Sequence, residues 1–77
     1  MLESADSQLD ARGLRCPMPL LKAKRALNAL APGQALAVLA TDSGSQRDFT
    51  VFCEQSGHEL LLSEERDGVY RYLLRKR

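Results

Sequence analysis

The segment Gln34-Ala35-Leu36-Ala37-Val38-Leu39-Ala40-Thr41 is a nearly continuous apolar run in the middle of the chain. A short run of this kind, bounded by turn residues, is typical of a buried strand. Pro32-Gly33 precedes the run, and Asp42-Ser43-Gly44-Ser45 follows it with residues that favour a turn and a helix cap. We therefore predict a buried strand over residues 34–41.

The residues before this strand predict a helix over 17–30, preceded by a loop at 11–15 and a short strand at 7–10. Pro17 suits the first helical position, and Pro19 is tolerated in the first turn, where backbone donors lack partners. The helix should end before the Pro-Gly pair. Its apolar residues fall on one face at helical spacing: Leu20, Ala23, Ala26, Leu27 and Leu30.

The residues after the central strand predict a second helix over 45–56, which Gly57 ends. Strands at 58–65 and 69–75 should follow, because Asp67-Gly68 is a strong signal for a two-residue hairpin turn. The side chains expected to face the core are Phe49, Phe52 and Cys53 on the helix and Tyr70, Tyr72 and Leu74 on the last strand.

The order β-α-β-α-β-β predicts an α+β fold, a two-layer α/β sandwich with two helices on one face of a four-stranded mixed sheet. The right-handed crossover rule makes the first two strands parallel. We expect one domain over residues 1–77, with residues 1–6 flexible. The second face of the sheet should be partly open and available to a partner.

Composition narrows the function classes. A net charge of +1 gives no strong field to attract nucleic acid or a membrane surface. No segment approaches the ~20 apolar residues of a membrane span, and the acidic first residues do not form a signal peptide. Two cysteines without a second pair imply neither a disulfide framework nor a zinc cluster. We expect a cytoplasmic protein without a metal site or a bound cofactor.

Cys16 is the candidate reactive residue. It directly precedes Pro17 and should therefore lie at or near the N-cap of the first helix, where free backbone N–H groups and the helix dipole favour an anion. Thiolates are the reactive form of cysteine, and nearby cations lower the thiol pKa. Arg12, Arg15 and Lys22 are close enough in sequence to add to this effect. The alternative is that Cys16 is only a capping or buried residue.

The surroundings of Cys16 narrow its chemistry. No His or carboxylate forms a local motif with it, and there is no Cys-x-x-Cys pair. This favours a single thiol that takes a sulfur and passes it on. A thiol-disulfide oxidoreductase would need Cys53, which we expect to be a small buried residue. His58 is expected to be a cap or strand-start residue rather than a general base.

The first helix also carries a candidate docking surface. Two apolar and two cationic side chains lie away from its buried stripe: Met18, Leu21, Lys22 and Arg25. An apolar spot ringed by positive charge favours an acidic protein partner. Scattered surface residues without a role, or cations that contact tRNA phosphates, are the alternatives.

The run from Leu9 to Pro19, which contains Gly13-Leu14-Arg15-Cys16-Pro17-Met18-Pro19, resembles the signature of the TusA/SirA family of small sulfur carriers. The resemblance continues along nearly the whole chain from Leu9. The further matching segments are Pro32-Gly33, Ala40-Thr41-Asp42, Arg47-Asp48, Phe52-Cys53, Gly57-His58-Glu59-Leu60 and Tyr70-Arg71-Tyr72-Leu73.

This resemblance implies that Cys16 carries sulfane sulfur as a transient persulfide. It also implies that Gly13, Pro17 and Pro19 shape the loop, and that Asp42, Arg47 and Asp48 help to recognise partners. It implies a cysteine desulfurase or rhodanese-like sulfur donor and a downstream acceptor protein, as in tRNA thiolation, molybdenum cofactor assembly or sulfur oxidation. The family fold resembles the C-terminal domain of translation initiation factor three.

The chain departs from TusA proper at two places. Met18 stands where TusA proper usually has Glu, and Phe49-Thr50-Val51 replaces a stretch that contains Ile-Pro. Whether the chain is TusA proper or a paralogue with other partners therefore stays open. A carrier that relays a persulfide, rather than a stand-alone multi-turnover enzyme, is the function expected. A non-catalytic regulatory or interaction module of the same fold is the alternative.

Overall fold

The apolar run forms the second strand, β2 (Ala35–Ala40), in the computed structural model, which describes residues 5–77. Every predicted element is present, and no bound differs from the predicted one by more than two residues. The chain order is β1 (Ser7–Ala11), α1 (Met18–Asn28), β2, α2 (Ser45–Ser56), β3 (Glu59–Arg66) and β4 (Val69–Arg75).

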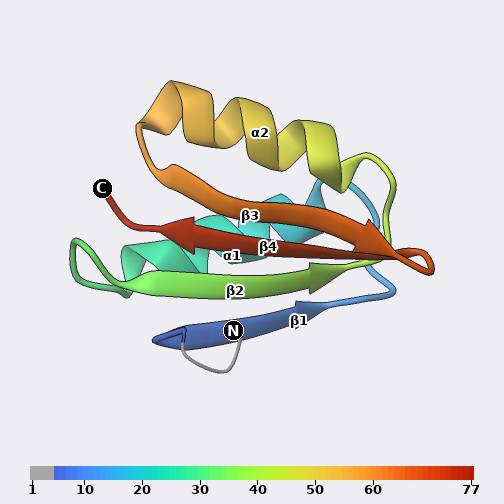
Figure 1. Cartoon of the computed structure of the whole chain (residues 1–77), viewed down its shortest axis with the longest axis horizontal. Coiled ribbons are helices and arrows are strands. Elements are labelled where there is room, and N and C mark those ends of the chain that lie inside the picture. The colour runs from blue at the N-terminus through green and yellow to red at the C-terminus, as the bar shows by residue number, and fades with distance from the viewer. Residues whose placement is uncertain (1–4) are drawn as a thin grey trace.

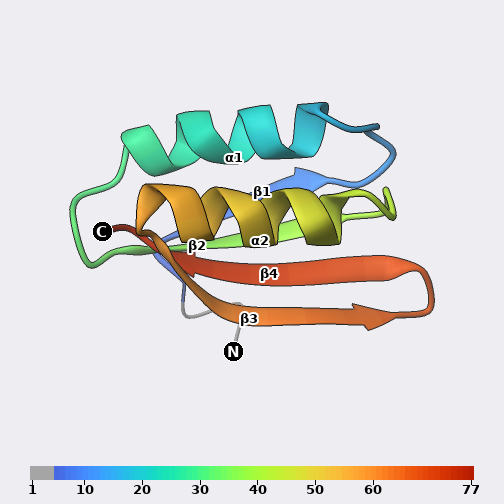
Figure 2. The ribbon, with the colours of Figure 1, turned by 90° about the horizontal axis from the view of Figure 1, so that it is seen from above.

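The sheet has the strand order β1-β2-β4-β3, with β1 parallel to β2 and the other pairs antiparallel. Both helices cover the same face of this sheet (Figures 1 and 2). The predicted two-layer α+β fold is therefore confirmed. Asp67 and Gly68 have φ values of 53° and 81°. These left-handed conformations are the ones that a two-residue hairpin turn between β3 and β4 requires.

The core lies between the helices and the sheet. Phe49 of α2 and Tyr72 of β4 are fully buried, and their rings stack with centroids 4.5 Å apart. The hydroxyls of Tyr72 and Ser45 lie 2.7 Å apart in a buried hydrogen bond, which satisfies both groups at the start of α2. Ala23 and Leu27 of α1 complete the contact, as the apolar stripe predicts.

The other face of the sheet carries half-buried residues of the central strands. Leu39 of β2 pairs with Arg71 of β4 in the register, next to the pair Val38 and Tyr72, which faces the core. Leu39 and Arg71 therefore lie on the face that the helices leave uncovered.

Of the six N-terminal residues predicted to be flexible, residues 1–4 lie outside the described part of the chain, so that prediction stays untested.

The topology sets where the functional loops meet. Because β1 and β2 are parallel and each leads into a helix, α1 and α2 both begin at the same end of the sheet (Figure 2). The loop before α1 and the loop before α2 are thereby neighbours, although about thirty residues separate them in sequence. Cys16 lies in the first loop, and Asp42 lies in the second.

Candidate functional site

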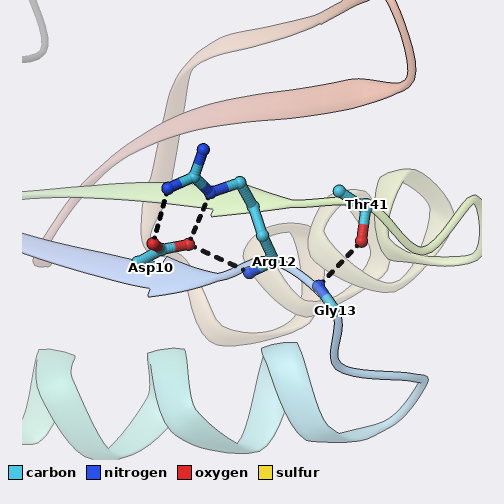
Figure 3. A network of polar contacts seen from close by, with 4 residues as sticks. All are labelled: Asp10, Arg12, Gly13 and Thr41. Carbon is cyan, nitrogen blue, oxygen red and sulfur yellow. Dashed lines mark hydrogen bonds and ion pairs between the residues drawn. The ribbon is translucent and has the colours of Figure 1, made fainter.

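The loop between β1 and α1 is held by its own backbone and by β2. Gly13 has a φ of 83°, which favours glycine, and its N–H donates to the Thr41 Oγ1 at 2.9 Å (Figure 3). The Met18 N–H then donates to the Arg15 carbonyl at 2.8 Å, which closes a turn around Cys16. The sequence thus predicts correctly that the chain turns here into a helix.

The two prolines lie at the beginning of α1. Pro17 is the N-cap residue, and Pro19 is buried in the first turn. Cys16 precedes the N-cap by one residue, and its side chain is exposed. No side chain caps the described helix end. The placement of Cys16 at or near the N-cap is therefore close to what the sequence predicts.

The Cys16 sulfur lies against the first turn of α2. Its Sγ donates a hydrogen bond to the Asp48 Oδ2 at 2.7 Å. This bond raises the thiol pKa of Cys16 above its ordinary value, and partial desolvation and the charges of Asp48 and Asp42 act in the same direction. The sequence-based expectation of a lowered pKa is therefore wrong, because it did not include the carboxylates of Asp48 and Asp42. Asp48 holds the thiol, not the thiolate.

Within residues 5–77, none of the cations predicted to favour a thiolate forms a hydrogen bond or an ion pair with Cys16. Arg12 donates through Nε and a terminal nitrogen to Asp10, at 2.9 and 2.8 Å, as Figure 3 shows. This pairing lowers the pKa of Asp10 to about 2, chiefly through the hydrogen bonds from Arg12. Arg15 and Lys22 are exposed, and within residues 5–77 no hydrogen bond or ion pair joins either one to Cys16.

A groove between the two helices extends from Cys16. Its volume is about 510 Å³, and α1 and α2 form its walls together with the loop before α2. Across it, the Lys24 ammonium lies 5.4 Å from the centroid of the Phe52 ring, a cation–π distance. The lining residues are Cys16, Leu20, Lys24, Gly44, Arg47, Asp48, Val51, Phe52 and Gln55.

Most of this groove is missing from the sequence-based site. The lining residues that were not predicted as site residues are Leu20, Lys24, Gly44, Val51, Phe52 and Gln55. Arg47, Val51 and Gln55 are spaced by four, which places them on one face of a helix, so the sequence did hold a signal. The sequence did not show that this face of α2 is exposed. Val51 would ordinarily be expected in the core, yet it is 40% exposed.

The predicted docking residues of α1 are brought together by the structure. Met18 and Leu21 are 42% and 47% exposed, and with Lys22 and Arg25 they line a separate shallow hollow of about 110 Å³. This hollow does not include Cys16. The first helix therefore offers two adjoining surfaces, the groove that contains the cysteine and an apolar and cationic patch.

The predicted polar residues of the second loop surround the cysteine from the other side. The Asp42 Oδ2 accepts the Gly44 N–H at 3.1 Å, and Arg47 lines the groove. A Cβ atom added at Gly44 would lie 3.8 Å from the Cys16 Cβ and only 3.0 Å from the Asp42 carboxylate. A side chain at Gly44 would therefore crowd the Asp42 carboxylate, whereas its contact with the cysteine would be an ordinary van der Waals contact.

The second cysteine and the only histidine lie apart from this chemistry. Cys53 is 6% exposed in the core, and burial raises its thiol pKa. The His58 Nδ1 accepts the Arg77 N–H at 3.0 Å, which fixes the C-terminus beside the start of β3. Within the described residues there is no cluster of potential metal ligands. In that same part of the chain, no helix is long and apolar enough to cross a membrane.

Fold and site together define a small α+β protein with a single exposed thiol between two helix ends. The chain matches the family described as "Sulfurtransferase TusA" over residues 7–76. It is 51% identical to the sulfur carrier protein TusA of Allochromatium vinosum over 92% of this chain and 93% of that protein. The corresponding protein of Pseudomonas aeruginosa is 44% identical over 100% of this chain and 98% of its own length.

The fold has a solved counterpart. The crystal structure of a SirA-like protein from Desulfitobacterium hafniense matches with a TM-score of 0.80 and 30% identity, over 90% of this chain and 95% of that one. The chain belongs to the TusA family of sulfurtransferases.

Proposed function

We propose that this protein is a sulfur carrier that accepts sulfane sulfur on Cys16 as a transient persulfide and relays it to an acceptor protein. The observation that carries the proposal is that Cys16 is exposed at one end of an interhelical groove, in a chain that belongs to the TusA family. The relatives named sulfur carriers match over more than nine-tenths of the chain.

The transfer step needs only the Cys16 sulfur. Its thiolate attacks the outer sulfur of a donor persulfide, and a new S–S bond forms as the donor S–S bond breaks. The electron pair of the broken bond leaves with the donor cysteine, which takes up the proton that Cys16 released. One sulfur atom changes carrier, and no external oxidant or reductant is consumed. Delivery repeats the exchange, with an acceptor thiolate attacking the outer sulfur on Cys16.

The proposed donor is a cysteine desulfurase or a rhodanese-like enzyme, and the proposed acceptor is a protein of a sulfur-delivery route such as tRNA thiolation or molybdenum cofactor assembly. Protein partners suit the two adjoining surfaces of α1. The patch of Met18, Leu21, Lys22 and Arg25 would receive an acidic protein surface. No direct binding to nucleic acid and a cytoplasmic location complete the proposal.

The test is sulfur loading followed by intact mass measurement. Incubation with a cysteine desulfurase and cysteine should add the mass of one sulfur atom to the wild type, and a thiol reductant should remove it. The Cys16→Ser variant should gain nothing. A rhodanese with thiosulfate serves as the second donor, so that a failure with one donor class does not decide the result. If neither donor loads the wild type, the proposal is wrong.

A second function is favoured by one observation. The raised thiol pKa of Cys16 and its hydrogen bond to Asp48 would suit a non-catalytic interaction module in which the cysteine is only structural. Such a module should bind its partners equally well after Cys16 is alkylated, and Cys16→Ser should leave its cellular role unchanged. A sulfur carrier loses its function after alkylation of Cys16 and also in the Cys16→Ser variant. These two proteins therefore distinguish a sulfur carrier from an interaction module.

A further inference from the structure

Within residues 5–77, the two carboxylates beside the Cys16 sulfur form no ion pair with a cation. The Asp48 Oδ2 is 2.7 Å from Sγ, and Asp42 adds a second negative charge from the neighbouring loop. Among residues 5–77, the recorded ion pairs are Arg12 with Asp10 and Arg75 with Glu59, and neither includes these two acids. The site therefore differs from Asp10, whose charge is paired.

The charged groups around the sulfur are few. Asp42 comes from the loop before α2 and Asp48 from the first turn of α2, while the cations that line the groove are Lys24 of α1 and Arg47 of α2. The Lys24 ammonium lies over the Phe52 ring. Ionising Cys16 would place a negative sulfur against the Asp48 oxygen that accepts its proton, so the free protein holds the thiol form.

We propose that Asp48 is a positioning residue that keeps the Cys16 of the empty carrier as a hydrogen-bonded thiol, and that a basic side chain of the sulfur donor releases it by pairing with Asp48. The partner class is thus a protein with a Lys or Arg beside its own reactive sulfur. The consequence for sulfur transfer rests on the proposed function, whereas the control of the thiol does not.

The release of the Cys16 thiol from Asp48 moves protons and charges and changes no other bond. When a cation pairs with Asp48, the Cys16 thiol gives its proton to solvent, and the thiolate then attacks the outer sulfur as described above. The donor cysteine leaves as a thiolate and takes up a proton from solvent. In the product, the negative charge resides on the outer sulfur, which is one S–S bond further from Asp48. The empty carrier is thereby less reactive toward stray electrophiles than a free thiolate at the same position.

Thiol-disulfide exchange with three small disulfides of different charge tests this proposal. Cystamine is cationic, 2-hydroxyethyl disulfide is neutral and dithiodipropionate is anionic, and all three react with Cys16 by the same chemistry. In the wild type at low salt, cystamine should react faster than dithiodipropionate, and added salt should reduce the ratio. If the anionic disulfide reacts faster at low salt, the proposal is overturned whether or not any variant folds.

The variant that tests Asp48 directly is Asp48→Asn. A larger thiolate fraction at pH 7, only partly offset by lower nucleophilicity, should make the neutral disulfide react about threefold faster. The preference for cystamine should narrow in the same variant. An ultraviolet titration of the thiolate should show the Cys16 pKa falling toward its ordinary value. An unchanged rate and an unchanged titration would overturn the proposal.

Three further variants complete the design. Asp48→Glu keeps the charge and should keep the slow wild-type rate. Asp42→Asn should have a smaller effect than Asp48→Asn, because Asp42 is not hydrogen-bonded to the sulfur. Glu54→Gln removes one exposed charge from the same helix and should change nothing. If the protein does not accept sulfur from a desulfurase or a rhodanese, the disulfide exchange rates still test the role of Asp48. The sulfur carrier function and the control of the thiol by Asp48 can therefore be disproved independently.

Discussion

The two cysteines of this protein have thiol pKa values that are raised for different reasons. Cys16 is exposed in the loop before α1, and a hydrogen bond to Asp48 raises its pKa. Cys53 is buried in the core beneath α2, and desolvation raises its pKa. A partner protein can neutralise a carboxylate at the surface, but its binding does not reverse the burial of Cys53 in the core. Only the first thiol can therefore be switched on by binding.

The position of each cysteine follows from local sequence. Cys53 comes four residues after Phe49, so it lies on the same buried face of α2. Cys16 precedes the N-cap of α1 and belongs to no helical face. Cys16 and Cys53 both have a raised thiol pKa, so they are distinguished by their exposure to solvent and not by their acidity.

The largest expected difference between the two thiols is in their rate of alkylation. Iodoacetamide should label Cys16 of the native protein at least about 100-fold faster than Cys53, because the buried thiol must wait for the core to open. Mass spectrometry of the two cysteine peptides after timed labelling gives both rates. In denaturant the ratio should approach one. Equal rates in the native protein would remove the distinction drawn here.

A smaller difference is expected in stability. Cys53→Ser places a hydroxyl in the core and should lower the free energy of unfolding by about 1 to 2 kcal/mol. Cys16→Ser changes an exposed residue and should alter it by less than about 0.5 kcal/mol. Thermal or urea unfolding of the two variants measures this.

Sulfur loading should show the opposite pattern. Cys53→Ser is expected to load as the wild type does at a temperature where it stays folded, and Cys16→Ser is expected not to load. Together the two variants separate the cysteine that maintains the fold from the one that carries sulfur. A loss of loading in folded Cys53→Ser would show that the two thiols act together, as in an oxidoreductase.

The smallest expected effect is a pH dependence of stability. Both thiols have a raised pKa in the folded protein, so the unfolded chain loses these protons first as the pH rises. The unfolded state then binds fewer protons, and the free energy of unfolding should fall above about pH 8.5. Below that pH, both states hold the thiols protonated, and their contribution is constant.

Urea unfolding between pH 7 and pH 9.5 follows this change. Tyr72, whose pKa burial also raises, contributes little over most of this range, because its unfolded form ionises only near pH 10. The decline should be less steep in Cys53→Ser than in the wild type, because one of the shifted groups is gone. A stability that rises over this range in the wild type would contradict the raised pKa values.

The fold was predictable because its signals are local and agree with one another. The apolar run of β2, the Pro-rich start of α1 and the Asp67-Gly68 turn each indicate one element, and the crossover rule then orients β1 against β2. The half-buried residues on the uncovered face of the sheet, Leu39 and Arg71, also follow from this arrangement.

The site was only partly predictable. The exposure of Cys16 and of the apolar and cationic patch of α1 could be inferred from position, but the partner of the Cys16 sulfur could not. Asp48 is 32 positions away in sequence, and its contact depends on which rotamer each side chain adopts across two helix ends. Likewise, Arg12 was expected to lower the thiol pKa of Cys16, yet it forms an ion pair with Asp10, two residues earlier. Sequence proximity of charges is therefore a weak guide to their pairing.

The central claim is that sulfur resides on Cys16 and not on Cys53. It is tested most directly by loading the wild type with a cysteine desulfurase and cysteine, trapping persulfides with an alkylating reagent, and mapping the peptides by mass spectrometry. We expect the added sulfur in the peptide that contains Cys16, with none in the peptide that contains Cys53. Added sulfur on Cys53, or on a Cys16→Ser protein treated in the same way, would contradict it.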